Sequence, residues 1–139
     1  MDAPYDLERF VTAQAPVIDK ARSELSEGRK RSHWMWFIFP QIAGLGYSPA
    51  SRTYAITSLE EARAYLAHPV LGARLTECAR ILTRVPGRTA EQIFGEVDAL
   101  KLRSCVTLFL RAAPGEPVFR QVLDQYFDGI PDSATEQRI

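Results

Sequence analysis

The chain has 139 residues, of which 46% are hydrophobic and 24% charged, a composition typical of one ordinary globular domain. Basic and acidic residues number 17 each, so no net charge attracts nucleic acid or an acidic membrane surface. Cys78 and Cys105 are too few and too far apart for a disulfide framework or a zinc site, and we predict no metal and no cofactor.

The N-terminal stretch MDAPYDLERF lacks the basic and apolar regions of a signal peptide. The longest apolar run, Trp34 to Phe39, is six residues long, against about 20 needed to cross a bilayer. We therefore expect a cytoplasmic protein that makes no contact with a membrane. Cys105 lies on the apolar face of a predicted helix and is expected to be buried and unreactive.

Helices are predicted along the whole chain, because no run alternates apolar and polar residues for long enough to form a strand. In the first half, Asp6 is expected to cap the helix LERFVTAQ, and the helix PVIDKARSELSE is expected to end at Gly28 in the left-handed conformation. Ser48, which precedes a proline, is a further N-cap, and Ser58 with Glu61 predicts a capping box.

The second half repeats these signals. Thr89 with Gln92 predicts another capping box, and Asp98 is expected to cap the helix ALKLRSCVTLFLRAA. Pro117 opens the helix PVFRQVLDQYF, and Asp132 is expected to cap a last turn.

The run HWMWFIFPQI is apolar on every face when plotted at about 100° per residue, which is typical of a buried helix. Its aromatic side chains are therefore expected to form the centre of the core. The sequence predicts an all-α fold, with residues 1–139 forming a single compact domain of about seven to nine helices around this central helix.

Three basic residues, RKR, lie where this central helix is expected to begin. A helix start carries unpaired N–H groups and partial positive charge, so bases there cost stability unless an anion is bound. One interpretation is a solvated loop. The other is a pocket for phosphate or carboxylate, with Lys30, Arg31 and His33 as donors and Trp34 or Trp36 as a stacking face.

A second polar group lies in the stretch DALKLRSC. Lys101 borders the apolar stripe of its helix, with Asp98 one turn before it and Ser104 beside it. Such a lysine either extends its ammonium to water or is held by Asp98 and directed into a cleft. If the two groups form one site, Lys101 and Ser104 line one concavity with Lys30 and His33.

Four stretches of the sequence resemble the bacterial family known as Domain of Unknown Function 1810: GRKRSHWMWFIFPQ, YAITSLEEARAYLAHPVLGARL, DALKLRSCVTLF and VFRQVLDQYFDGIPDSAT. The resemblance runs from about Leu7 to Thr135 and implies an all-helical single domain with no assigned activity. The positions that match the family's motifs are Lys30, His33, Trp34, Trp36, Pro40, Gln41, Ser48, Asp98, Lys101 and Ser104.

The order of the KLRSCVTLF helix and the VFRQVLDQYFDG helix is also similar to the NADAR proteins, small helical glycosidases that act on ADP-ribose derivatives. The Ser-Glu-His type motif of that family has no counterpart in this sequence. The similarity therefore indicates a class of ligand and does not support a glycosidase reaction.

Together these features predict the binding of an anionic small molecule, phosphate-bearing and nucleotide-like or ADP-ribose-like, in a basic and aromatic cleft. The expected ligand-binding residues are Lys30, Arg31, His33, Trp34, Trp36, Gln41, Lys101 and Ser104. If hydrolysis occurs, Asp98 is the carboxylate that could serve as base.

The alternative is a non-enzymatic protein-interaction module, in which the basic loop docks a partner and the aromatic side chains are purely structural. Nucleic-acid binding is disfavoured, because the balanced charge leaves one cluster of three bases.

Overall fold

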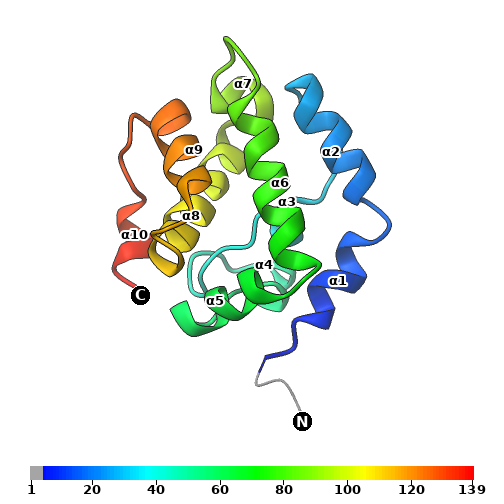
Figure 1. Ribbon diagram of the computed structural model, residues 1–139. Coiled ribbons are helices and arrows are strands. Elements are labelled where there is room, and N and C mark those ends of the chain that lie inside the picture. Colours follow the sequence, from blue (N-terminus) through cyan, green and yellow to red (C-terminus); the bar gives the residue numbers. More distant parts are fainter. Residues whose placement is uncertain (1–4) are drawn as a thin grey trace.

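The computed structural model describes residues 5–139, which contain ten helices and no strand (Figure 1). The all-α prediction is confirmed. The helices are α1 (Glu8–Gln14), α2 (Ile18–Glu27), α3 (Met35–Ile38), α4 (Pro49–Thr53), α5 (Leu59–Ala67), α6 (Leu71–Thr83), α7 (Ala90–Phe94), α8 (Glu96–Ala112), α9 (Pro117–Phe127) and α10 (Ser133–Glu136). Several of these are one turn long, which brings their number above the predicted seven to nine.

Two long helices, α6 and α8, organise the fold. Helix α6 runs through the middle of the view in Figure 1, with α1 and α2 on one side and α8, α9 and α10 on the other. It packs against α2, α5 and α9, while α8 packs against α5, α7, α9 and α10. No helix within residues 5–139 combines the length and the apolar character that crossing a membrane requires.

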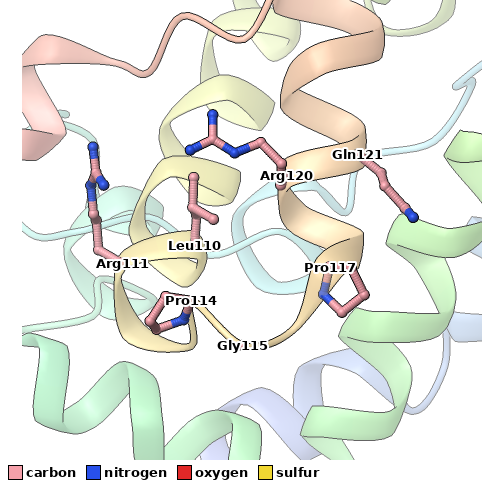
Figure 2. A pocket seen from close by; sticks show the side chains of 7 residues that line it. All are labelled: Leu110, Arg111, Pro114, Gly115, Pro117, Arg120 and Gln121. Atoms are coloured by element: carbon pink, nitrogen blue, oxygen red, sulfur yellow. The ribbon is translucent and has the colours of Figure 1, made fainter.

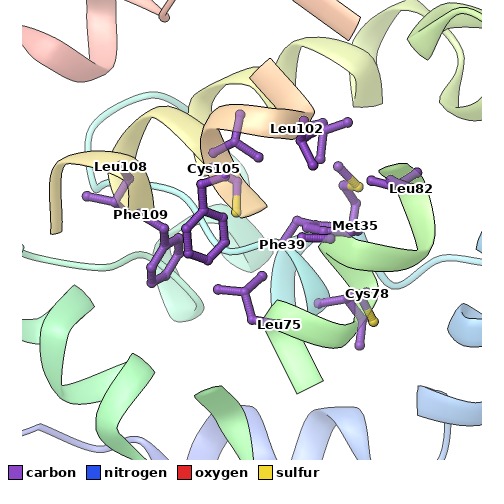
Figure 3. Close-up of a cluster of buried hydrophobic side chains, with 14 of the residues drawn as sticks. Met35, Phe39, Leu75, Cys78, Leu82, Leu102, Cys105, Leu108 and Phe109 are labelled. Atoms are coloured by element: carbon purple, nitrogen blue, oxygen red, sulfur yellow. The ribbon is translucent and has the colours of Figure 1, made fainter. Parts of the chain in front are cut away.

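The core lies where the segment of α3 meets α6 and α8 (Figure 3). Figure 3 shows buried side chains from all three segments, namely Met35, Phe39, Leu75, Cys78, Leu82, Leu102, Cys105, Leu108 and Phe109. Cys105 is fully buried, as predicted from its position on the apolar stripe.

Most of the predicted helix ends are confirmed. Gly28 ends α2 with φ of 73°, in the left-handed region that favours glycine. Thr89 and Gln92 form a reciprocal capping box on α7. The side chains of Ser48 and Asp132 accept hydrogen bonds from the first-turn backbone of α4 and α10.

Two predicted caps are wrong, and one predicted capping box is only half formed. Asp6 makes no side-chain cap on α1. Ser58 caps α5, but Glu61 does not complete the box, because its Oε1 accepts hydrogen bonds from the backbone and hydroxyl of Thr57. Asp98 lies in the first turn of α8 rather than before it, because the chain enters α8 directly from the glycine that ends α7.

The aromatic helix is shorter than predicted, since α3 has four residues and the chain leaves it before Pro40. Trp36 and Phe37 are partly exposed. The buried side chains of this run are Trp34, Met35, Ile38 and Phe39. The run is therefore part of the core, but no long helix begins at the three basic residues.

Candidate functional site

The loop between α2 and α3 is held by the carboxylate of Glu24. Glu24 Oε1 accepts hydrogen bonds from the backbone N–H of Arg31 at 2.8 Å and of Ser32 at 3.0 Å, and from Trp34 Nε1 at 3.0 Å. Its Oε2 accepts a hydrogen bond from Ser32 Oγ at 2.6 Å. These backbone N–H groups, which the sequence suggested for a bound anion, thus bind a carboxylate of the protein itself.

The four donors explain the acidity of Glu24. Its burial alone raises the pKa, but the hydrogen bonds from Ser32, from the two backbone amides and from Trp34 outweigh that effect and lower the pKa from 4.5 to about 2. Glu24 is therefore ionised at neutral pH and stabilises the loop as an anion.

Lys30 extends from this loop toward α8, where it meets Asp98. Lys30 Nζ lies 2.9 Å from Asp98 Oδ2, and Lys101 Nζ donates to Asp98 Oδ1 at 3.0 Å. Lys30 Nζ also lies over the ring of Trp34, 5.1 Å from its centroid, and Lys101 Nζ lies 4.2 Å from that of Trp36. Each ammonium thus contacts both the shared carboxylate and the ring of a tryptophan.

The cluster of Lys30, Asp98 and Lys101, called here the lysine cluster, carries two positive charges and one negative charge. The three side chains are only 9%, 18% and 20% exposed. Burial raises the pKa of Asp98, but the hydrogen bonds and charges of the two lysines outweigh it and hold the pKa below its ordinary value. Asp98 is therefore ionised, and one positive charge is in excess.

Two adjoining cavities border this cluster. The first has a volume of about 120 Å³ and is lined by Lys30, His33, Trp34, Met35, Trp36, Phe37, Asp98 and Lys101. The second has a volume of about 340 Å³ and is lined by Trp36, Gln41, Leu45, Gly46, Val97, Leu100, Lys101, Ser104, Asp132 and Ala134. Trp36 and Lys101 form part of both walls, so the two cavities are neighbours.

The residues predicted for a single site thus divide between two cavities. Lys101 lines the first together with Lys30 and His33, as expected, whereas Ser104 lines the second. The Ser104 hydroxyl lies 3.1 Å from the carbonyl oxygen of Leu100 and 3.2 Å from Oδ2 of Asp132, the residue that caps α10.

Arg31 is not brought to either cavity. Its guanidinium is exposed and donates to Glu27 Oε2 at 2.6 Å, one helical turn before it. Arg31 contributes to the loop through its backbone N–H, which binds Glu24.

Glu24 is the residue that the sequence-based reasoning missed. It lies three residues after Ala21 and directly before Leu25, both fully buried, so it borders the apolar face of α2. An acid in that position has little access to water and needs internal donors. That placement was the signal that could have identified it.

A further cavity of about 490 Å³ lies where α8 connects to α9 (Figure 2). Its two arginines, Arg111 and Arg120, are 44% and 49% exposed, and Arg111 is paired with Glu136. No residue predicted for the site lines this cavity. Its charges are solvated, and it offers no cluster comparable to the two lysines.

The chain's sequence matches the model of a family described as "Protein of unknown function (DUF1810)" over residues 4–139. The fold is similar to the crystal structure of the conserved hypothetical protein Rv1873 from Mycobacterium tuberculosis, with 52% sequence identity and a TM-score of 0.96. That similarity covers 97% of this chain and 96% of the other. A search of curated proteins gave no match. The similarity to the NADAR proteins stays a prediction.

Proposed function

Since this chain belongs to the DUF1810 family, as its motifs predicted, and the family's description assigns no activity, we propose a function from the site alone. The function is the binding of an anionic small molecule at the lysine cluster.

The observation that carries this proposal is the excess positive charge of the cluster. A charge withdrawn from water is costly unless a counter-charge or hydrogen bonds replace the lost solvation. Asp98 supplies one negative charge for the two ammonium groups, and each ammonium has three N–H donors to place. A phosphate or carboxylate in the first cavity supplies both the missing charge and further acceptors.

Trp36 favours a ligand with a flat or sugar-like part. Its ring is partly exposed and lies at the wall between the two cavities, where Lys101 covers one face. Aromatic faces bind nucleobases and sugars by stacking. This supports the finer proposal that the anion is phosphate-bearing and nucleotide-like or ADP-ribose-like.

Asp98 suits a positioning role better than a catalytic one. Both of its carboxylate oxygens contact lysines, and its pKa lies below the ordinary value. An effective general base has a pKa near the working pH, whereas the pKa of Asp98 is lowered further from neutrality. We therefore propose binding without a hydrolytic step assigned to Asp98.

The test is calorimetric titration of the wild type, Lys30→Met and Lys101→Met with inorganic phosphate, ribose 5-phosphate and ADP-ribose. We expect at least one probe to bind the wild type and each lysine variant to lose roughly 10-fold or more in affinity. Arg29→Met is the matched control, because this neighbouring base is exposed and lines neither cavity. Lack of binding by all three probes, or an equal loss in the control, contradicts the proposal.

A second candidate is a protein-interaction module, here with a partner-binding surface on the exposed apolar residues of α8 instead of the basic loop. Val97 and Leu100 are 67% and 63% exposed and lie on the rim of the second cavity. Large apolar side chains that lie together on a surface are typical of partner-binding sites. Pull-down from cell extract with the wild type and with Leu100→Glu tests it, and identical captured proteins would argue against it.

A further inference from the structure

The second cavity contains a buried polar group without a partner. Within residues 5–139, Gln41 Nε2 is the buried side-chain nitrogen for which the structure holds no hydrogen-bond acceptor. Gln41 is 7% exposed and lines the second cavity beside Trp36 and Lys101. A buried amide without a partner has lost its hydrogen bonds to water and gained none in return, which is unfavourable, so the position calls for an explanation.

The backbone of Gln41 is held in place by hydrogen bonds to a second segment of the chain. Ile42 and Ile56 form an isolated parallel bridge. In this bridge Ile56 N–H donates to the carbonyl of Gln41 at 2.8 Å, and Ala43 N–H donates to the carbonyl of Ile56 at 2.8 Å. A rigid backbone next to an unpartnered amide is the arrangement of a preorganised ligand contact.

The sizes of the two cavities point the same way. Pockets that hold small molecules measure about 300–1,000 Å³. The first cavity, at about 120 Å³, is large enough for an anionic group but not for a nucleotide or sugar phosphate. The second, at about 340 Å³, falls in that range and shares the walls made by Trp36 and Lys101. Because Lys101 and Trp36 border both cavities, an anion held at Lys101 lies next to the space of the second cavity.

We infer that Gln41 forms a second subsite, which donates a hydrogen bond to an uncharged oxygen on the body of a sugar phosphate or nucleotide whose phosphate lies at the lysine cluster. This inference rests on the proposed function and deepens it, because it names the part of the ligand that the second cavity selects. Trp36 lies at the boundary between the two subsites and contacts both parts.

The experiment compares inorganic phosphate, ribose 5-phosphate and adenosine 5′-monophosphate by titration calorimetry on the wild type and Gln41→Met. Under this inference, inorganic phosphate contacts the lysine cluster alone, whereas the other two probes also contact Gln41. We expect Gln41→Met to bind inorganic phosphate as the wild type does and to bind at least one of the larger probes about 3- to 10-fold more weakly, the loss expected for one neutral hydrogen bond. Gln121→Met, the same exchange at an exposed glutamine of α9, is the control.

Thermal unfolding without ligand gives a second readout. If the amide of Gln41 has a partner only when a ligand is bound, Gln41→Met keeps or raises the melting temperature of the free protein, since it removes an unpaired buried polar group. A clear fall in melting temperature shows that the amide serves the fold, and overturns the inference. Phosphate binding with unchanged affinity for both larger probes overturns this inference but not the proposed function. Failure of every probe to bind the wild type overturns both.

Discussion

Glu24 and Trp34, ten residues apart in the chain, are joined by a hydrogen bond of 3.0 Å from the indole Nε1 to the carboxylate. The same carboxylate binds two backbone amides and a hydroxyl of the intervening loop. The path of the chain from α2 to the lysine cluster is thus set by one buried acid.

Replacement of Glu24 by alanine is expected to destabilise the fold by ~3 kcal/mol, because the indole N–H and the loop amides lose their acceptor inside the protein. Glu24→Gln, which keeps one acceptor oxygen, is expected to cost less. Urea denaturation followed by circular dichroism measures both. Glu27→Ala removes an exposed acid from the same helix and is expected to change stability by less than about 0.5 kcal/mol. Equal effects at the two positions would refute the role assigned to Glu24.

The acidity of Glu24 also predicts how stability depends on pH. The pKa of this carboxyl is about 2 in the folded chain against an ordinary 4.5, so the unfolded chain takes up the proton first as the pH falls. The stabilisation is fully present above about pH 4.5 and is lost progressively toward pH 2, a difference of ~3 kcal/mol. The lowered pKa of Asp98 acts in the same direction.

The measurement is the free energy of unfolding of the wild type and of Glu24→Gln between neutral pH and about pH 2. We expect the gap between the two proteins to narrow as the pH drops, because protonation removes the charge that distinguishes them. A gap that stays constant over this range is the result that counts against the prediction.

Asp98→Asn removes the carboxylate that forms ion pairs with both Lys30 and Lys101. The folded protein is expected to lose about 2 kcal/mol, because two partly buried ammonium groups then repel each other. Under the proposed function, added phosphate stabilises Asp98→Asn more than the wild type, since the anion takes the place of the carboxylate. Calorimetric melting in phosphate and in chloride at equal ionic strength checks this. Equal phosphate effects on the two proteins would speak against an anion at this cluster.

The two thiols are expected to be unreactive in the native protein. Burial raises the pKa of Cys78 to about 12, and burial also raises that of Cys105 well above its ordinary value. Since the thiolate is the reactive form, both cysteines stay protonated and out of reach of reagents. Titration with a disulfide reagent should label neither residue quickly under native conditions and both in denaturant. Rapid labelling of the native protein would contradict the buried placement.

The sequence predicts the local features of the fold well, because they depend on residues a few positions apart. Gly28, Ser48 and the Thr89–Gln92 pair each terminate or start a helix as expected. The failure at Asp98 shows the limit of such reasoning. An acid near a helix start satisfies the rule for a cap. Here, however, the carboxylate of Asp98 pairs with Lys30 from a distant loop, and Gly95 is the residue that precedes the first turn of α8.

The sequence predicts which residues the candidate site contains, but not which contacts hold them together. Lys30 and Lys101 were expected to converge, yet the shared carboxylate between them depends on a contact across about 70 residues. Besides the contacts of Glu24, the backbone of Lys30 is held against α7, where the carbonyl of Ile93 accepts a hydrogen bond from Lys30 N–H at 2.8 Å. Such non-local contacts leave no periodic signal in the sequence.

The two tryptophans of the chain, Trp34 and Trp36, both belong to this site and each faces one of its ammonium groups. Indole emission therefore comes entirely from the neighbourhood of the lysine cluster. Trp34 is buried and reports an apolar setting, whereas Trp36 is partly exposed and responds to whatever approaches Lys101. The protein thus contains an intrinsic optical probe of its own site, and variants that keep a single tryptophan separate the signal at Lys30 from the signal at Lys101.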